Sequence, residues 1–140
     1  MSLSSDSCLK RIRLLVEQAG YKEVSNKRVE NACLTNNFDT KVAANQLIKE
    51  EDLKIYLEDL CIRSGYQPNK KFISSSCVKY KFAQEPVIKY TLKLFQAKTK
   101  VINECKKENL KMPNDTRLNH LILFYFGNWA SVLHNIREDP

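Results

Sequence analysis

The sequence predicts an all-α fold, on two observations. Only three glycines and four prolines occur in 140 residues, which is too few turn residues for a β-protein with many reversals of direction. Apolar side chains also recur every three or four positions over most of the chain, the spacing of amphipathic helices. Hydrophobic residues make up 43% and charged residues 28%, so the chain can form a folded core.

The first helix is expected from about Ser5 to Gln18. Ser5 or Asp6 can cap its start, and Gly20 suits the left-handed position that follows a helix end. Its apolar stripe consists of Cys8, Ile12, Leu15 and Val16.

Two further helices follow closely. Ser25 is a good cap for the second helix, Asn36-Asn37 ends it, and Asp39 caps the third. We expect Phe38 to fill the corner between the two helices. The inward-facing side chains of the third helix are expected to be Val42, Ala43, Leu47 and Ile48.

This segment resembles a known family. "LLVEQAGY" is similar to the first helix and loop of UBA domains, and "RVENACLTNNFDTKVAANQLI" is similar, without a gap, to helices 2 and 3 of the related CUE domains. The resemblance covers about residues 7–49 and implies a UBA-like three-helix bundle, over about residues 5–50, that binds ubiquitin or another protein. The surface implied for the partner consists of Ala19, Gly20, Tyr21, Asn45, Ile48 and Lys49, with Ala19-Gly20-Tyr21 in place of the Met-Gly-Phe of UBA domains.

A helical C-terminal unit is expected over about residues 53–138. Its clearest element is a long amphipathic helix over about residues 86–110, and "FISSSCVKYKF" before it is interpreted as a helix rather than a strand. Asn114 or Asp115 can cap a last helical region that bends at Gly127. "GY" occurs at residues 20–21 and again forty-five positions later, which indicates an internal duplication.

A basic character favours an acidic partner. The formal charge is +7 and the sequence pI about 9.2, and the basic clusters concentrate after Lys54. The alternative function is therefore a nucleic-acid-binding or chromatin-associated domain, with Tyr80, Tyr90 or Phe82 available for stacking on bases. Its lysines lie on one helix over residues 86–111 and include Lys89, Lys93, Lys100 and Lys107. The simpler interpretation of this lysine face is the solvated side of an amphipathic helix.

No catalytic chemistry is predicted. The sequence contains no HExxH, GxSxG, Walker or GxGxxG motif, and the two histidines have no carboxylate or thiol at metal-ligand spacing. We therefore expect no catalytic residue, no metal and no cofactor. The five cysteines are scattered among apolar residues and are expected to be free core thiols, as in the cytoplasm or nucleus. No apolar run is long enough to span a membrane.

The sequence thus predicts a non-enzymatic interaction module, an adaptor that contacts ubiquitin or another protein through the UBA-like surface. Nucleic-acid binding through the lysine face is the alternative. The identity of the partner and the oligomeric state are left open.

Overall fold

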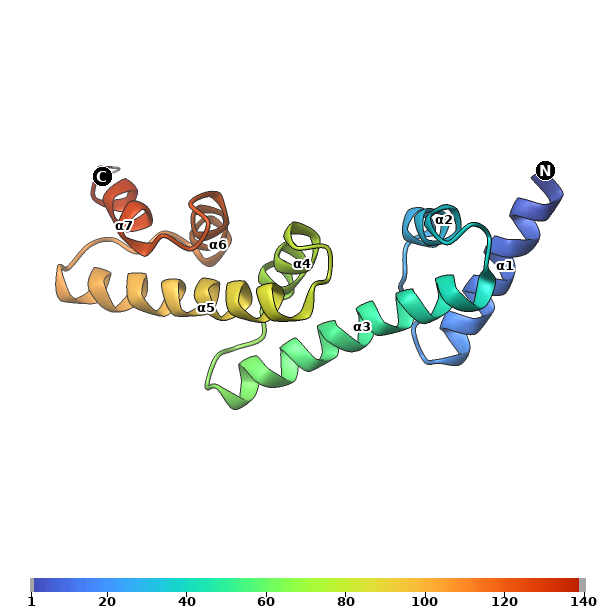
Figure 1. The fold of residues 1–140 in the computed structure, drawn as a ribbon. Helices are drawn as coiled ribbons and strands as arrows, with labels where there is room; N and C mark the ends of the chain where they lie inside the picture. The colour runs from blue at the N-terminus through green and yellow to red at the C-terminus, as the bar shows by residue number, and fades with distance from the viewer. Residues whose placement is uncertain (1, 139–140) are drawn as a thin grey trace. The chain divides into compact units, whose positions relative to one another are not determined.

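The computed structural model describes residues 2–138 of the chain, and the side chains of residues 6–138. All regular secondary structure in this range is helical, which confirms the all-α prediction (Figure 1). The helices are α1 Ser2–Gln18, α2 Asn26–Thr35, α3 Thr40–Arg63, α4 Lys70–Lys79, α5 Gln84–Lys107, α6 Asp115–Phe124 and α7 Trp129–Glu138.

The chain divides into two compact units within α3, which runs without a break through Glu50-Glu51-Asp52. Unit 1 is Met1–Ile55 and unit 2 is Tyr56–Pro140. Each unit has its own hydrophobic core, and each is described by itself below.

Unit 1 consists of α1, α2 and the first part of α3 around one core. The pair Ala43-Ala44 on α3 is completely buried, so α3 presents small side chains where it meets the other two helices. The other buried members of this core are Cys8, Ile12, Val16, Val24, Val29, Ala32, Cys33 and Leu47. Small residues at such a contact allow a close approach of the helices, which a short bundle needs for dense packing.

Two expectations about the α2–α3 corner were wrong. Phe38 does not fill the corner, because it adopts a left-handed conformation (φ 62°) and 48% of its surface is exposed. Val42 is also exposed, because it lies about 140° around the helix from the buried Leu47 at 3.6 residues per turn. The α2–α3 corner thus leaves apolar surface in solvent, to which the exposed Leu34 also belongs.

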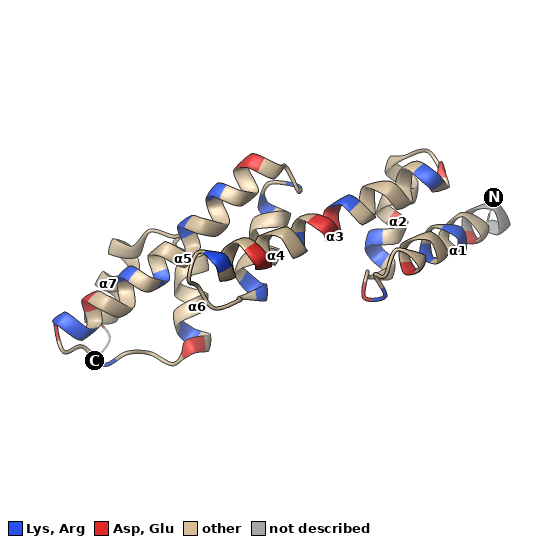
Figure 2. Cartoon of the chain, turned by 90° about the horizontal axis from the view of Figure 1, so that it is seen from below, with Lys and Arg blue, Asp and Glu red and all other residues tan. Residues whose placement is uncertain are grey.

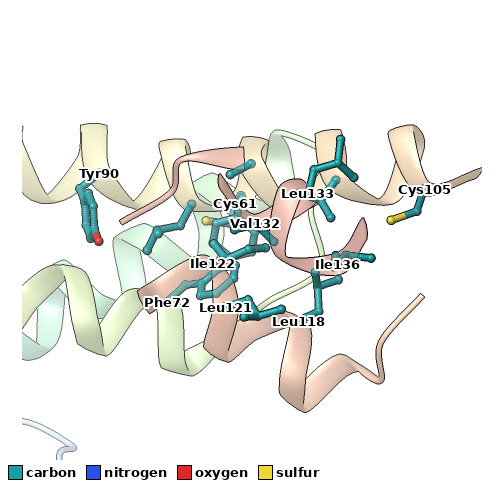
Figure 3. Packing of buried hydrophobic residues seen from close by; sticks show 14 residues of the cluster. Cys61, Phe72, Tyr90, Cys105, Leu118, Leu121, Ile122, Val132, Leu133 and Ile136 are labelled. Carbon is teal, nitrogen blue, oxygen red and sulfur yellow. The ribbon is translucent and has the colours of Figure 1, made fainter. Parts of the chain in front are cut away.

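Unit 2 is built around α5. Side chains from α5, α6 and α7 point into a common core, which also includes Phe72 from α4 and Cys61 from the last turn of α3 (Figure 3). Two polar residues are completely buried here, Ser76 and Thr91, and both are satisfied within their own helices. The Ser76 hydroxyl donates to the Phe72 carbonyl (2.8 Å) and the Thr91 hydroxyl to the Val87 carbonyl (2.7 Å).

One local motif occurs three times along the chain. A helix ends in a left-handed residue, a short loop leads to a capped helix of ten residues, and a second left-handed turn leads into the next helix. The ten-residue helices are α2, α4 and α6. The caps Ser25, Asn69 and Asn114 each accept a hydrogen bond from the backbone amide three residues later.

The backbone geometry of the three motifs matches in detail. Gly20, Gly65 and Asn109 have φ values of 100°, 88° and 53°, and they recur after 45 and 44 residues. In each case the amide of the next residue donates a hydrogen bond to the carbonyl five residues earlier. These bonds run from Tyr21 to Val16, from Tyr66 to Cys61 and from Leu110 to Cys105 (2.9–3.1 Å). The duplication indicated by the two "GY" pairs is therefore a threefold structural repeat, in which α3 and α5 each end one motif and begin the next.

Candidate functional site

The surface implied by the UBA resemblance begins at the loop after α1. Ala19 and Gly20 are exposed, and no atom lies within 4 Å of a Cβ added at Gly20. Tyr21 is half-buried, and its hydroxyl donates a short hydrogen bond to the Asp52 carboxylate on α3. The hydrogen bond to Asp52, together with partial burial, raises the pKa of Tyr21 to about 12. The tyrosine is therefore fixed to α3 within unit 1.

The remaining residues of this surface lie on α3. Asn45 and Lys49 are exposed and one turn apart, so they share a face of the helix. Ile48 is half-buried and packs against the core of unit 1, as Tyr21 does. The structure thus places two of the six predicted partner contacts partly inside the unit and leaves four in solvent.

The four lysines predicted for nucleic acid share one stripe of α5. Lys89, Lys93, Lys100 and Lys107 fall within about 40° around the helix at 3.6 residues per turn. Blue segments recur along α5 in Figure 2, which colours lysine and arginine blue. The stripe is not uniform, however, because only the lysines at its C-terminal end are paired with a carboxylate.

Glu104 forms ion pairs with both lysines at the C-terminal end of the stripe. Its carboxylate lies 3.3 Å from Lys100 and 3.5 Å from Lys107. The hydrogen bond from Lys100 is the main reason that the pKa of Glu104 is lowered. Lys89 and Lys93, in contrast, have no carboxylate within ion-pair distance in the described part of the chain. The N-terminal half of α5 therefore carries the more available positive charge.

Lys89 and Lys93 line a groove in unit 2 with a volume of about 420 Å³. We call it the lysine–aromatic groove, and its walls come from the α4–α5 corner, the first turns of α5 and the α6–α7 corner. Its lining residues are Lys79, Tyr80, Glu85, Pro86, Lys89, Tyr90, Lys93 and Phe126. Three positive charges therefore face one negative charge within a space bounded by three aromatic rings.

The aromatic rings and Lys79 form one cluster in this groove. The Lys79 ammonium lies 4.4 Å from the ring centroid of Phe126, 5.6 Å from that of Tyr90 and 5.7 Å from that of Tyr80. Tyr80 and Tyr90 meet edge to face, with centroids 5.6 Å apart. Tyr90 forms the buried floor, and burial raises its pKa, so its phenol is neutral at physiological pH. Tyr80 and Phe126 keep 36% and 57% of their surface in solvent.

The start of α5 adds a further feature favourable to anions. Its N-cap residue is Ala83, which provides no side-chain hydrogen bond to the first amides of this 24-residue helix. Uncapped amides and the helix dipole both favour negative charge at this end. Glu85 in the first turn uses part of that potential.

A second hollow in unit 2, of about 720 Å³, is also lined by three lysines and one carboxylate. It lies between the loop at residues 65–69 with the first turn of α4, the middle of α5 and the start of α6. Its central lysine, Lys98, is already paired with Asp115 at 2.7 Å. Asn119 donates to the same carboxylate (3.3 Å), and its Oδ1 atom is buried without a hydrogen-bond partner. The hollow therefore differs from the lysine–aromatic groove in that one of its lysines is paired with a carboxylate, although Lys70 and Lys71 also line it.

Tyr80 and Tyr90 were predicted from the sequence as candidate stacking residues, but Lys79 and Phe126 were not predicted to lie beside them. Phe82, the third candidate, does not line the groove. Lys79 and Phe126 lie 47 positions apart on two different corners, so no local pattern links them. The threefold repeat is the one signal that could have brought the two corners together.

Across residues 2–138, no three His, Cys, Asp or Glu side chains converge in a way that could hold a metal ion. None of the helices in that range combines the length and the apolar content needed to cross a bilayer. Comparison with protein-family models, with curated proteins and with solved structures gives no match for this chain.

Proposed function

We propose that this chain is a non-enzymatic binding protein whose lysine–aromatic groove binds single-stranded nucleic acid. The observation that carries the proposal is the meeting of Lys79, Lys89 and Lys93 with exposed aromatic rings in one groove. A lysine that lacks a carboxylate partner can neutralise a phosphate of the nucleic acid. The counterions that the nucleic acid then releases favour binding.

The aromatic rings favour a single strand over a duplex. Bases stack on protein rings only when their faces are free, and in a duplex those faces are already occupied by neighbouring base pairs. Tyr80 and Phe126 offer partly exposed rings within the groove, next to the Lys79 charge. Charge for the backbone and rings for the bases are the two components that sequence-tolerant single-strand binding requires.

The charge component is tested by titrating a fluorescently labelled single-stranded oligonucleotide with the full chain and recording anisotropy at several salt concentrations. Lys89→Gln with Lys93→Gln is expected to weaken binding about tenfold or more. The slope of the logarithm of the binding constant against the logarithm of the salt concentration should also become less steep, by roughly 0.7 per lost phosphate contact. Lys100→Gln with Lys107→Gln is the matched control, since it removes the same charge from the ion-paired end of the same stripe. Equal losses in the two double variants would show general charge attraction instead of a site.

The stacking component is tested with Tyr80→Leu and Phe126→Leu. Loss of one stacked base is expected to weaken binding roughly 5- to 150-fold, the range that corresponds to about 1–3 kcal/mol. Phe124→Leu is the control, because Phe124 is as exposed as Phe126 but does not line the groove. A duplex of the same sequence should bind more weakly than the single strand, and the opposite order would contradict the proposal.

Unit 1 supports a second candidate function, protein binding through the UBA-like surface. The open loop tip at Ala19-Gly20 and the exposed Asn45 and Lys49 favour it. The ligand that the resemblance implies is ubiquitin or another protein, and a patch of this size is consistent with weak binding. Titrating ubiquitin into the isotope-labelled chain should shift the amide resonances of Gly20, Tyr21 and Ile48. Unchanged resonances at these positions would exclude ubiquitin as the partner of this surface.

A further inference from the structure

Unit 1 contains two thiols in direct contact. The Sγ atoms of Cys8 on α1 and Cys33 on α2 lie 2.9 Å apart, and both residues are buried. Cys8 Sγ is also 3.6 Å from the carbonyl oxygen of Phe38 in the α2–α3 corner. Cys8 on α1 therefore contacts both α2 and the corner that leads from α2 to α3.

This arrangement distinguishes the pair from other cysteines of the chain. Cys61 and Cys105 are equally buried, yet neither has a sulfur atom as a partner within the described residues. Cys8 and Cys33 are 25 positions apart in sequence, so their contact depends on the packing of α1 against α2. A disulfide has an S–S bond of about 2.05 Å, so the two sulfur atoms are about 0.9 Å from bonding distance.

We propose that Cys8 and Cys33 are a modification site, where a peroxide converts the two thiols into a reversible disulfide that links α1 to α2. The proposal concerns unit 1 alone and does not depend on the function of the lysine–aromatic groove in unit 2.

The reaction is balanced with hydrogen peroxide as the oxidant. One thiol loses its proton, and its sulfur attacks a peroxide oxygen, so that an S–O bond forms and the O–O bond breaks. The released hydroxide takes the proton and leaves as water, and the sulfur becomes a sulfenic acid. The second sulfur then displaces the sulfenic hydroxyl, which leaves as another water molecule. Two electrons pass from the sulfur atoms to the peroxide, and a dithiol reductant reverses the change by exchange.

Burial makes this modification slow in the folded chain. Desolvation, together with the hydrogen bond to Cys8, raises the pKa of Cys33 to about 11, so little thiolate is present near neutral pH. Oxidation therefore depends on transient opening of α1 from α2. Once formed, the disulfide connects the two helices, and we expect it to slow the unfolding of unit 1.

The test uses the full chain, treated with hydrogen peroxide, quenched in denaturant with an alkylating reagent and digested for mass spectrometry. The expected product is a single cross-linked peptide pair that contains Cys8 and Cys33, and dithiothreitol should remove it. Cys61→Ser with Cys105→Ser should retain the cross-link, whereas Cys8→Ala should lose it. If Cys8→Ala does not fold, the peptide map of the unmodified sequence decides the question.

Two outcomes would overturn the proposal. One is that Cys8 and Cys33 both remain alkylatable after oxidation. The other is that either cysteine is recovered mainly as a sulfinic acid or in cross-links to other cysteines. Binding of the oligonucleotide is measured on the same oxidised sample. Because the groove lies in unit 2, the affinity of the oxidised chain for the oligonucleotide should stay within about twofold of that of the reduced chain.

Discussion

The side chain of Lys93 on α5 packs against the backbone of Gly127 in the α6–α7 corner. A Cβ atom added at Gly127 would lie 3.2 Å from Cγ and 3.4 Å from Cε of this lysine. Gly127 also has a φ of 75°, a conformation that other residues adopt only with strain. The absence of a side chain at Gly127 therefore determines where a groove lysine can lie.

Gly127→Ala is expected to have two effects. The left-handed backbone should lower the free energy of unfolding by about 1–2 kcal/mol, measured by chemical denaturation. The new methyl group should also displace Lys93, so the affinity for the labelled single strand should fall severalfold.

Gly65→Ala separates these two effects. Gly65 has a similar φ of 88°, but no atom lies within 4 Å of an added Cβ. It should share the loss of stability and keep the affinity. If both variants bind equally well, the contact with Lys93 has no role in the groove.

The hydrogen bond between Tyr21 and Asp52 predicts a pH dependence of unit 1. Because the pKa of Tyr21 is raised from 10.0 to about 12, the folded state favours the neutral phenol. The stabilisation should be complete below about pH 10 and should be lost as the pH rises toward 12. In Asp52→Asn the pKa of Tyr21 should fall toward 10, as measured by NMR titration of the ring resonances.

Asp59→Asn is the control for this titration. Asp59 is an exposed residue of α3 that pairs with Arg63 and does not contact Tyr21. Its removal should leave the pKa of Tyr21 near 12, and an equal shift in the two variants would contradict a specific bond to Asp52.

The partly buried ion pairs of Arg28 in unit 1 should contribute more stability than an exposed ion pair in unit 2. Arg28 on α2 lies 2.8 Å from Glu50 and 2.5 Å from Glu51 on α3, with only 25% of its side chain exposed. Arg28→Gln leaves the carboxylates of Glu50 and Glu51 without the positive charge of the arginine. It should therefore lower the free energy of unfolding by about 1–3 kcal/mol, as measured by urea denaturation. Arg63→Gln removes an exposed pair with Asp59 and should cost under about 0.5 kcal/mol.

Local chemistry made most of the helices predictable. Ser25 and Asn114 cap helices as their side chains suggest, and Gly20 occupies the left-handed position expected of it. These features depend on residues within a few positions of one another, which is the range over which sequence patterns carry information.

The corners between helices were not predictable in the same way. Asn37, Phe38, Lys81, Phe82 and Phe126 all have positive φ values, although only Asn is commonly found there. In each corner a backbone amide donates a hydrogen bond to the carbonyl of a buried helix residue five positions earlier. An example is the bond from the Phe82 amide to the Cys77 carbonyl (2.8 Å). Packing of the flanking helices imposes this turn, so the exposure of Phe38 and the groove position of Phe126 follow from tertiary structure.

The repeat relates the two surfaces that the sequence suggested separately. Asn45 and Lys49 on α3 occupy the same positions, 44 residues earlier, as Lys89 and Lys93 on α5. In unit 1, however, Gln46 stands where unit 2 has Tyr90, and Asn36 stands where it has Tyr80. Asn36 there donates hydrogen bonds to the Ala32 carbonyl and the Gln46 side chain, and neither of the two positions carries an aromatic ring. The corresponding helix face of unit 1 therefore has one lysine and lacks the two tyrosines.

This difference predicts unequal effects of two equivalent lysines. Lys49→Gln and Lys93→Gln remove the same charge from the same position of the motif, and both lysines are exposed. If the groove binds nucleic acid through combined charge and stacking, Lys93→Gln should weaken single-strand binding severalfold and Lys49→Gln by less than about twofold, as measured by anisotropy. Equal losses would mean that net charge alone determines the affinity. A larger loss for Lys49→Gln would move the binding site to unit 1, because only a ligand held there would depend more strongly on the lysine of α3.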